Sequence, residues 1–507
     1  MNDPKKRADV CLILEGTYPY VAGGVSSWVR DLIFAQKTLT FHLVMILPPG
    51  ADRTPRYDIP DNVIGKTEIV VGDLPKGNFF VKGGKKLLQG LESPLQRLTV
   101  GGGLTEIQEL VEVLAPFKGK VGRELLLNSE EAWQMLQRMY YAAHSKSSFL
   151  DYFWTWRALL GGVYSILLAP TPKASVYHAI STGYAGLFLA KSRLTTGRPG
   201  LLTEHGIYTN ERRIEITMAD WLAEDKVINS LHIDKRQPDL RDIWVETFVT
   251  FSRACYACCE QIITLYEGNQ EFQLEDGADP DKLRVIPNGI DYDHYAKVER
   301  EQNKHPPTIA LIGRVVPIKD IKTYIRAVYH LHKTIPNLIA YVCGPTDEDP
   351  IYHGECLEMV SHLDLTKTLI FTGRVNLVEY LGQIDVMVLT SISEAQPLVI
   401  LEAGAAGVPS VATDVGSCRE MIEGNHQEDP PLGRAGEITP LSDPVGVADA
   451  LAKMLNDPDY LKQCAETIKQ RVRRYYHKSD LNRTYLDLYN QHVAMGDLLL
   501  PADNGVG

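Results

Sequence analysis

The amino-acid sequence predicts an α/β protein made of two open parallel-sheet domains that face a central ligand cleft. Two stretches of the chain alternate short apolar strand patterns with helical patterns, which is the signature of parallel sheets built from βαβ units. A charged segment at 297–307, KVEREQNKHPP, separates the two stretches and has the composition of a linker. Because open α/β folds bind ligands beyond the carboxyl ends of their strands, we expect the functional residues at those edges.

Composition limits the class of protein. The chain has 507 residues with a net charge of -12, so it is long enough for two or three domains and lacks the basic field of a nucleic-acid-binding protein. The apolar run near the N-terminus ends at Glu15, which is too short for a signal peptide. The longest apolar stretch, at 158–170, is shorter than the roughly 20 residues that cross a bilayer. We therefore expect a cytoplasmic protein, and peripheral contact with the inner membrane stays open.

The first stretch opens with a buried strand at 8–14, ADVCLIL, and a helix whose apolar positions begin at Val25 and recur with helical spacing. FHLVMIL at 41–47 is the next predicted strand. Between about 73 and 155 the alternation gives way to Gly- and Lys-rich loops and helical segments, which we interpret as an insertion. Alternation returns with ASVYHAIS, LLTEHG and QIITLY, and ends near VIPNGID.

The second stretch contains five predicted strands, each followed by a helical pattern. They read TIALIGRV, LIAYVCGP, TLIFTGRV, DVMVLTS and PSVATDVG. We expect a first domain over 1–300, a second over 301–475, and a C-terminal helix and tail at 476–507 that can pack back on the first domain.

Eight cysteines are scattered along the chain, with one cluster at Cys255, Cys258 and Cys259. A zinc site would need further ligands at matching spacing, and the sequence has no second CxxC or HxxxH pair for it. We expect reduced thiols in the core and no bound metal.

Glu402 is the only charged residue between Ala395 and Thr413, in a segment apolar enough to be a buried helix. Burying an unpaired carboxylate costs several kcal/mol, so this side chain needs a partner. A second carboxylate, Glu394, stands eight positions earlier in the loop after the strand DVMVLTS. One reading is that Glu402 pairs with a lysine or arginine of its own domain.

The other reading is that these two carboxylates hold a ligand. The next helix is expected to start at Gln396, Pro397 and Leu398, with Pro397 at its first position. The free N–H groups at the start of a helix bind anions. A ligand with both phosphates and hydroxyl groups would contact the helix start and the carboxylates together. A nucleotide sugar is such a ligand.

Two further patterns point to phosphate. In LIGRVVPIKD, Arg314 and Lys319 follow the first strand of the second domain, where a pair of cations would meet a diphosphate. Solvated loop cations are the alternative. Gly23 and Gly24 stand directly before the first helix, as if the backbone must approach a ligand there, although the stretch lacks the GxGxxG dinucleotide motif.

The order of these motifs is similar to that of a known family. The chain resembles the retaining glycosyltransferases of family 4, which have the GT-B fold of two Rossmann-like domains. The motifs that carry this resemblance are, in order, GG-V, TEHG, PNGID, GR-x4-K and E-x7-E with GxP after it. More narrowly, the chain resembles the glycosyltransferases of bacterial Pel exopolysaccharide synthesis. This resemblance rests on the stretches EGTYPYVAGGVSSW, TEHGIYTNER, LYEGNQ and SEAQPLVILEAGAAGVP. The insertion at 73–155 also fits that subgroup.

The resemblance implies roles for the matching residues. Glu402 would accept hydrogen bonds from ribose hydroxyls, and Glu394 would lie beside the donor sugar. Arg314 and Lys319 would neutralise the departing diphosphate. Gly23 and Gly24 would let the backbone of the first domain approach the diphosphate. The backbone of Arg374 and Val375 would contact the base.

One departure from the family concerns histidine. Members often carry His-x-His after the strand written here VYHAIS, but His178 is followed by Ala179 and Ile180. His205 in TEHG, and after it His178, are the candidates for the missing polar group, and either can instead be a satisfied core histidine. Asn288 in PNGID either shapes the cleft floor or belongs to a structural turn.

The function that the resemblance implies is transfer of a hexosyl unit from a UDP-sugar, with glucose or an N-acetylhexosamine as the sugar, to a growing exopolysaccharide. No metal or other cofactor is expected. The implied partners are the nucleotide sugar, a polysaccharide acceptor and a membrane-embedded synthesis complex, without nucleic acid. The alternatives are a nucleotide-sugar epimerase or hydrolase of the same fold, or a non-catalytic nucleotide-sugar-binding subunit.

Overall fold

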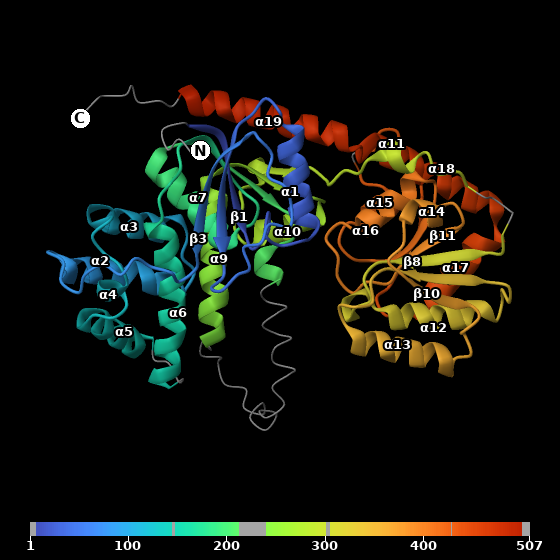
Figure 1. Cartoon of the computed structure of the whole chain (residues 1–507), viewed down its shortest axis with the longest axis horizontal. Helices are drawn as coiled ribbons and strands as arrows, with labels where there is room; N and C mark the ends of the chain where they lie inside the picture. The colour runs from blue at the N-terminus through green and yellow to red at the C-terminus, as the bar shows by residue number, and fades with distance from the viewer. Residues whose placement is uncertain (1–6, 144–147, 212–239, 301–304, 427, 499–507) are drawn as a thin grey trace. The chain divides into compact units, whose positions relative to one another are not determined.

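The computed structural model describes residues 7–143, 148–211, 240–300, 305–426 and 428–498. The chain forms two compact units, each with its own parallel sheet (Figure 1). The first unit takes in the described residues of Met1–Thr264, Asn269–Val285 and Tyr485–Gly507. The second takes in those of Leu265–Gly268 and Ile286–Thr484. The predicted α/β class with two parallel-sheet domains is confirmed.

The sheet of the first unit has seven parallel strands in the order β3-β2-β1-β4-β5-β6-β7. The interior strand β1 pairs with β2 on one side and β4 on the other, so the strand order reverses beside it. Ligands of open α/β sheets bind at such a reversal. The strands are β1 (Ala8–Glu15), β2 (Phe41–Leu47), β3 (Val63–Val70), β4 (Ala174–Ala179), β5 (Gly200–Glu204), β6 (Cys259–Thr264) and β7 (Leu283–Val285).

The predicted strands do not include β3, which lies at the edge of this sheet. Lys66 and Glu68 stand among its apolar residues, and only Gly65 and Ile69 are buried. An edge strand of this kind carries too few apolar residues to stand out from a polar loop.

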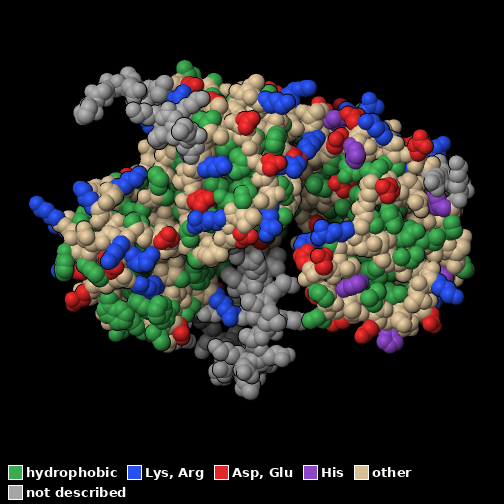
Figure 2. All heavy atoms as spheres, in the orientation of Figure 1, with side chains coloured by type: hydrophobic (Ala, Val, Ile, Leu, Met, Phe, Trp, Pro, Cys, Tyr) green, Lys and Arg blue, Asp and Glu red, His purple; other side chains and the backbone are tan. Residues whose placement is uncertain are grey.

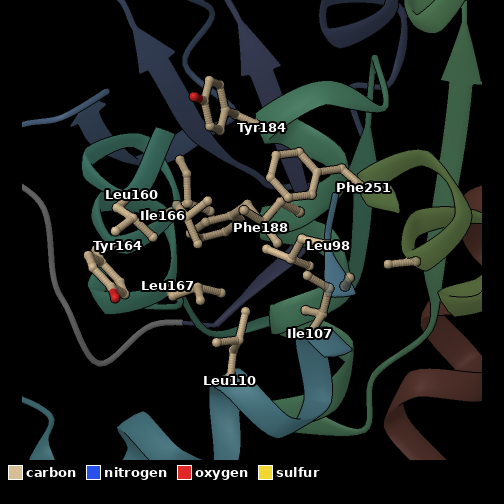
Figure 3. Packing of buried hydrophobic residues seen from close by; sticks show 14 of the residues in the cluster. Leu98, Ile107, Leu110, Leu160, Tyr164, Ile166, Leu167, Tyr184, Phe188 and Phe251 are labelled. Carbon is tan, nitrogen blue, oxygen red and sulfur yellow. The ribbon is translucent and has the colours of Figure 1, made fainter. Parts of the chain in front are cut away.

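The insertion between β3 and β4 is helical, as predicted, and its last helix ends at Leu168, beyond the predicted limit of 155. Figure 3 shows side chains from its helices packed against α7 and α9 of the same unit. The stretch 158–170 falls largely in the buried part of the last insertion helix. The helices are α2 (Gly84–Arg97), α3 (Leu104–Leu114), α4 (Arg123–Leu126), α5 (Glu130–Ala142) and α6 (Phe149–Leu168) in the insertion, with α1 (Gly24–Ala35), α7 (Gly183–Thr196), α9 (Leu240–Cys258) and α10 (Gly268–Glu275) outside it.

Some large apolar side chains of the insertion face solvent. Trp133 and Tyr141 on α5, and Leu150 and Trp154 on α6, are exposed, and Figure 2 shows hydrophobic side chains gathered in the region of α5. Across the described ranges, no helix is both long and apolar enough to cross a membrane. All eight cysteines are buried and free of disulfides.

The sheet of the second unit has six parallel strands in the order β10-β9-β8-β11-β12-β13. Five of them match the predicted strands, and β13 is additional. The strands are β8 (Thr308–Ile312), β9 (Ile339–Cys343), β10 (Leu369–Gly373), β11 (Val386–Leu389), β12 (Ser410–Thr413) and β13 (Gly436–Thr439). The helices are α11 (Tyr292–Tyr295), α12 (Ile321–His332), α13 (Pro350–His362), α14 (Leu377–Leu381), α15 (Leu398–Ala405), α16 (Cys418–Glu423), α17 (Pro444–Asn456) and α18 (Pro458–Tyr475).

The two units divide at Val285 and Ile286, earlier in the chain than the predicted boundary at 300. Ile290 and Tyr292 are buried in a core cluster of the second unit, so the polar segment at 297–307 follows residues that already belong to that unit. The last described helix, α19 (Lys478–Leu498), contributes its residues from Tyr485 onward to the first unit.

Candidate functional site

Most of the residues expected to bind the nucleotide sugar lie at the carboxyl edge of the second sheet. Arg314 and Lys319 follow β8, Arg374 and Val375 follow β10, and Glu394 follows β11. Strands β10, β9, β8 and β11 are consecutive neighbours in the sheet. The fold of this unit alone therefore brings these loops to one edge.

Lys319 and Glu394 form an ion pair at this edge. Both side chains are largely buried, with 19% and 14% of their surfaces exposed. Their loops are also joined through the backbone, because the N–H of Ile392 donates to the carbonyl of Ile318 at 2.9 Å. The hydroxyl of Thr390 donates to the carbonyl of Lys319 at 3.0 Å. This cation and this carboxylate are therefore held as a unit.

The loop that carries Glu394 is supported from the side by Gly416, which follows β12. A Cβ atom at Gly416 would lie 2.2 Å from the carbonyl oxygen of Glu394, and the residue has a φ of +52°. The N–H of Ser417 donates to the carbonyl of Ala395 at 2.9 Å. Sequence reasoning missed this support, and a glycine in the loop three residues after a buried strand was the signal that could have found it.

The two arginines of this edge are more exposed. Arg314 pairs with Glu348 of the loop after β9, and the two side chains are 54% and 49% exposed. Arg374 lies 3.9 Å from Asp347, with both side chains largely in solvent. Arg314 is therefore at the predicted edge but contacts Glu348, which sequence reasoning did not single out.

Glu402 lies on the second turn of α15, as predicted, with Pro397 as the residue that caps the helix. The hydroxyl of Tyr295 interacts with its carboxylate, and burial raises the pKa of Glu402. No lysine or arginine of the described ranges forms an ion pair with it. The alternative reading, in which a lysine or arginine of the same domain pairs with Glu402, finds no support among the described residues, because the phenol of Tyr295 on α11 lies beside the carboxylate.

Gln396 and Asn288 are brought together, although they are far apart in the sequence. The N–H of Asn288 donates to the side-chain oxygen of Gln396 at 2.7 Å, and the Gln396 amide lies 3.5 Å from the carbonyl of Asn288. The side-chain oxygen of Asn288 is buried and has no hydrogen-bond partner in the part of the chain that the structure describes. Gln396 therefore holds the PNGID turn, and Leu398 packs against the core beside it.

In the first unit, α1 begins at Gly24 with Gly23 as its capping residue. The N–H of Gly23 donates to the hydroxyl of Tyr57 at 3.2 Å. A Cβ atom at either glycine would meet no other atom within 4 Å. The packing of the chain itself therefore does not require glycine at these two positions.

His205 follows β5, and its ring lies edge-on against Trp28 of α1, with 4.5 Å between centroids. Both ring nitrogens are buried without a hydrogen-bond partner among the described residues. Burial lowers the pKa of His205 to about 4, so the imidazole is neutral near pH 7. A buried polar ring without a partner in the protein takes its hydrogen bonds from ordered water or from a ligand.

His178 has a different environment. Its Nδ1 lies 2.7 Å from the hydroxyl of Tyr489 on α19, and its Nε2 lies 2.9 Å from the hydroxyl of Thr203. Burial lowers its pKa to about 3. This is a satisfied core histidine that fixes the C-terminal helix, so the expectation that it takes a catalytic part is corrected.

Glu204, directly before His205, is fully buried. Its carboxyl group accepts hydrogen bonds from Tyr256 at 2.9 Å and from the side-chain amide of Gln273 at 2.8 Å. Burial raises the pKa of Glu204 to about 7. The described residues contain no group of three or more His, Cys, Asp or Glu side chains that could hold a metal ion.

Two family models match the chain. Residues 8–281, more than half of its length, match the family described as "Domain of unknown function (DUF3492)". The chain belongs to the DUF3492 family. Residues 296–471 match "Glycosyl transferases group 1", so this DUF3492 member carries a group 1 glycosyltransferase domain in its second unit.

Curated relatives are similar to part of this DUF3492 chain. The D-inositol 3-phosphate glycosyltransferase 2 of Catenulispora acidiphila is 25% identical over 232 residues, covering 43% of this chain and 52% of the relative. The N-acetyl-alpha-D-glucosaminyl L-malate synthase of Bacillus anthracis is 30% identical over 134 residues, 26% of this chain and 33% of that protein. The chain thus spans about half or less of the length of these relatives.

Solved structures resemble the whole DUF3492 chain. The Anabaena protein Alr3699/HepE, solved in complex with UDP, has a TM-score of 0.57 at 14% identity, covering 95% of this chain and 99% of that one. The sucrose-phosphate synthase of Thermosynechococcus elongatus has a TM-score of 0.56 at 16% identity, covering 96% and 99%. Both likenesses show the fold, which is GT-B.

Proposed function

We propose that this protein is a retaining hexosyltransferase that moves a sugar from a UDP-sugar to a growing exopolysaccharide. The observation that carries the proposal is the pair of Lys319 and Glu394, held together beside the start of α15 at the carboxyl edge of the second sheet. A cation there suits a diphosphate, and a carboxylate suits the hydroxyl groups of a sugar.

Each of the other residues then has a role that its surroundings support. Glu402 accepts hydrogen bonds from the ribose, and Tyr295 orients its carboxylate. Arg314 exchanges Glu348 for the diphosphate, because its guanidinium is half exposed and can reorient. The backbone of Arg374 and Val375 reads the base at the neighbouring loop.

The chemical step follows from these charges. As the bond between the anomeric carbon and the phosphate oxygen lengthens, negative charge grows on the diphosphate and positive charge on the sugar ring. Arg314, Lys319 and the start of α15 stabilise the diphosphate, and the departing oxygen takes the proton of the acceptor hydroxyl on the same face. Retention needs no side-chain base by this route, and His205 supplies a neutral polar group rather than a proton acceptor.

The donor and the acceptor are supported by different observations. Solved structures of Alr3699/HepE contain UDP or UDP-glucose, which favours a uridine donor for a chain of the same fold. The resemblance of TEHGIYTNER and SEAQPLVILEAGAAGVP to PelF, the Pel exopolysaccharide glycosyltransferase, favours a polysaccharide acceptor. We place the reaction in the cytoplasm, beside a membrane-embedded synthesis complex.

The test is transfer from UDP-glucose, UDP-N-acetylglucosamine and UDP-N-acetylgalactosamine by the purified protein and by Glu402→Ala and Arg314→Ala. We expect one donor to be used, transfer to persist in excess EDTA, and both variants to lose turnover while remaining folded. Arg326→Ala changes an exposed arginine of the same unit and serves as the control.

Four outcomes would contradict the proposal. Full activity in Glu402→Ala or Arg314→Ala would remove the assigned site, and strict dependence on added metal would point to different chemistry. Release of free or epimerised sugar without an acceptor would indicate a hydrolase or epimerase. Binding of UDP without turnover, even with membrane partners present, would indicate a non-catalytic subunit.

A further inference from the structure

The helical insertion of the first unit carries an exposed surface to which no role has been assigned. Of the large hydrophobic residues in the described ranges, Phe80 is the most exposed, at 92%, and Phe79 beside it is 48% exposed. We propose that this surface docks the protein on a membrane of anionic lipids. The inference rests on the proposed function only in placing the reaction beside a membrane, and its test does not require sugar transfer.

The two phenylalanines lie in a loop, residues 75–83, that the fold holds at both ends. At one end the N–H of Arg123 donates to the carbonyl of Pro75 at 2.8 Å. At the other end Val81 packs against the core of the first unit, directly after Phe80 in the sequence. The rings are therefore exposed on an anchored loop, and burying them would stabilise the protein only against a partner.

Lysines gather in the same part of the insertion. They come from two segments, 75–86 and 117–123, that contain no aspartate or glutamate. The segments are in contact, because a Cβ atom at Gly77 would lie 2.5 Å from the backbone nitrogen of Gly122. Figure 2 shows Lys and Arg side chains on the side of the first unit where Figure 1 places α2. The lysines are exposed and form no ion pair with a described residue; they are Lys76, Lys82, Lys85, Lys86, Lys118 and Lys120.

The fold neither neutralises these positive charges nor gains stability from them. Asp73 and Glu92, the acidic residues nearest to the segment 75–86 along the chain, pair with arginines instead. Lys85 and Lys86 lie in the first turn of α2, where the helix dipole disfavours positive charge. A local excess of lysine on a chain with a net charge of -12 is suited to an anionic partner.

An anionic lipid surface is the partner that uses both features. Lysines are attracted to the negative surface of an anionic leaflet, and aromatic rings enter the boundary between headgroups and acyl chains. Lys76 and Lys82 stand on either side of the two phenylalanines in the sequence, so rings and charges can meet the leaflet together. An acidic peptide offers the charge without a broad apolar layer, and a free phosphate offers no apolar part.

The experiment uses the full chain and protein-free vesicles of two compositions. One is phosphatidylcholine alone, and the other is phosphatidylcholine with about one third phosphatidylglycerol, which is anionic. Phe80→Ala removes the most exposed ring, and the double variant Lys85→Glu and Lys86→Glu reverses two of the charges. Cosedimentation measures binding to each kind of vesicle, and the melting temperature checks folding.

Each variant has a matched control elsewhere in the chain. Phe34→Ala replaces a phenylalanine of α1 that is 46% exposed, close to the value for Phe79. The double variant Lys367→Glu and Lys462→Glu makes the same change of charge at two exposed lysines of the second unit. These controls separate docking through this surface from the general effects of lost apolar area and lost positive charge.

We expect the wild type and both controls to bind the phosphatidylglycerol vesicles and to leave the phosphatidylcholine vesicles largely unbound. Phe80→Ala and the variant of Lys85 and Lys86 should each weaken this binding about fivefold or more, while the melting temperature stays unchanged. Rising salt concentration should weaken the binding of the wild type as well, because it screens the lysines.

Binding of the wild type to neither vesicle, unchanged binding by either test variant, or equal losses in test and control variants would overturn the proposal. Binding to native membranes but not to protein-free vesicles would also overturn it, since the partner would then be a membrane protein. If the chain docks through this surface but transfers no sugar, the docking surface stands and the proposed function fails.

Discussion

The ammonium group of Lys319 pairs with the carboxylate of Glu394 and so ties the loop after β8 to the loop after β11. Three residues further on, Lys322 makes a comparable pair with Glu355 at 2.7 Å, but that pair is more exposed and does not involve the loop before α15. Replacing each lysine in turn therefore distinguishes the effect on turnover of losing a charge at the candidate site from the effect of losing any ion pair of this unit.

Lys319→Ala should reduce turnover with the donor sugar about a hundredfold or more, because it removes a preorganised positive charge that stabilises the departing diphosphate. Lys322→Ala should stay within about twofold of the wild type, since exposed ion pairs contribute about 0 to 1 kcal/mol. Steady-state kinetics with saturating donor, together with the melting temperature, measures both effects. Equal losses in the two variants would show that Lys319 has only a structural role.

Gly416→Ala should reduce turnover beyond what its loss of stability explains. Its new Cβ atom would meet the carbonyl oxygen of Glu394 at 2.2 Å, so the loop that carries this carboxylate must move. Gly407→Ala is the control, because Gly407 also has a positive φ but its nearest neighbour would be a Lys469 side-chain carbon at 3.9 Å. Both variants should lose about 1 to 2 kcal/mol from backbone strain. Unfolding in urea and kcat are compared, and unchanged kcat in Gly416→Ala would contradict the support that we assign to it.

The two buried histidines should respond differently to replacement. His178→Ala should lower the free energy of unfolding by about 1 to 3 kcal/mol, because the hydroxyl of Tyr489 loses its partner and the hydroxyl of Thr203 keeps only that of Tyr485, at 3.2 Å. His205→Ala breaks no hydrogen bond with a described residue, so it should cost less stability and lower turnover at least tenfold. Urea unfolding and kcat are measured for both. Wild-type turnover in His205→Ala would contradict the catalytic role that we propose for this residue.

Glu204 should make the stability of the protein depend on pH in a defined direction. Its pKa is about 7 in the folded protein and 4.5 ordinarily, so between these values the folded protein holds a proton that the unfolded chain has lost. This contribution to stability is present below pH 4.5 and is lost as pH rises through 7. Glu204→Gln removes it, so the stability of Glu204→Gln relative to the wild type should increase by about 1.4 kcal/mol per pH unit over that window.

The comparison is made by urea unfolding at pH 5.0 and pH 7.0. Glu466→Gln, at an exposed position of α18, gives the effect of removing a carboxylate at the protein surface. A constant difference between Glu204→Gln and the wild type at the two pH values would show that Glu204 titrates normally in the fold.

The sequence predicts much of this architecture because buried parallel strands leave a strong apolar pattern. ADVCLIL and DVMVLTS contain the continuous apolar runs VCLIL and VMVL, which form the interior of strands β1 and β11. The edge strand β3 carries Lys66 and Glu68 and leaves no such run. The predicted boundary between the units, at residue 300, lies later in the chain than the observed one. The polar segment at 297–307 shows that these residues are exposed to water, but it does not show which hydrophobic core the residues before it join.

The candidate site was predictable only in part. Charged residues after strands identify an edge of a sheet, so Arg314, Lys319 and Glu394 could be placed there from the sequence. Their partners could not, since Tyr295 and Glu348 come from other elements and reach the site only through folding. The same holds for His178 and His205, which look alike in the sequence but differ in whether distant hydroxyls satisfy their nitrogens.

The contribution of α19 to the first unit affects how the protein can be synthesised and shortened. Tyr485 and Tyr489 complete a core whose other members are encoded hundreds of codons earlier. A ribosome must therefore translate the whole of the second unit before the N-terminal half can finish folding. A premature stop codon near position 484 would leave the glycosyltransferase domain intact and damage the opposite half of the polypeptide.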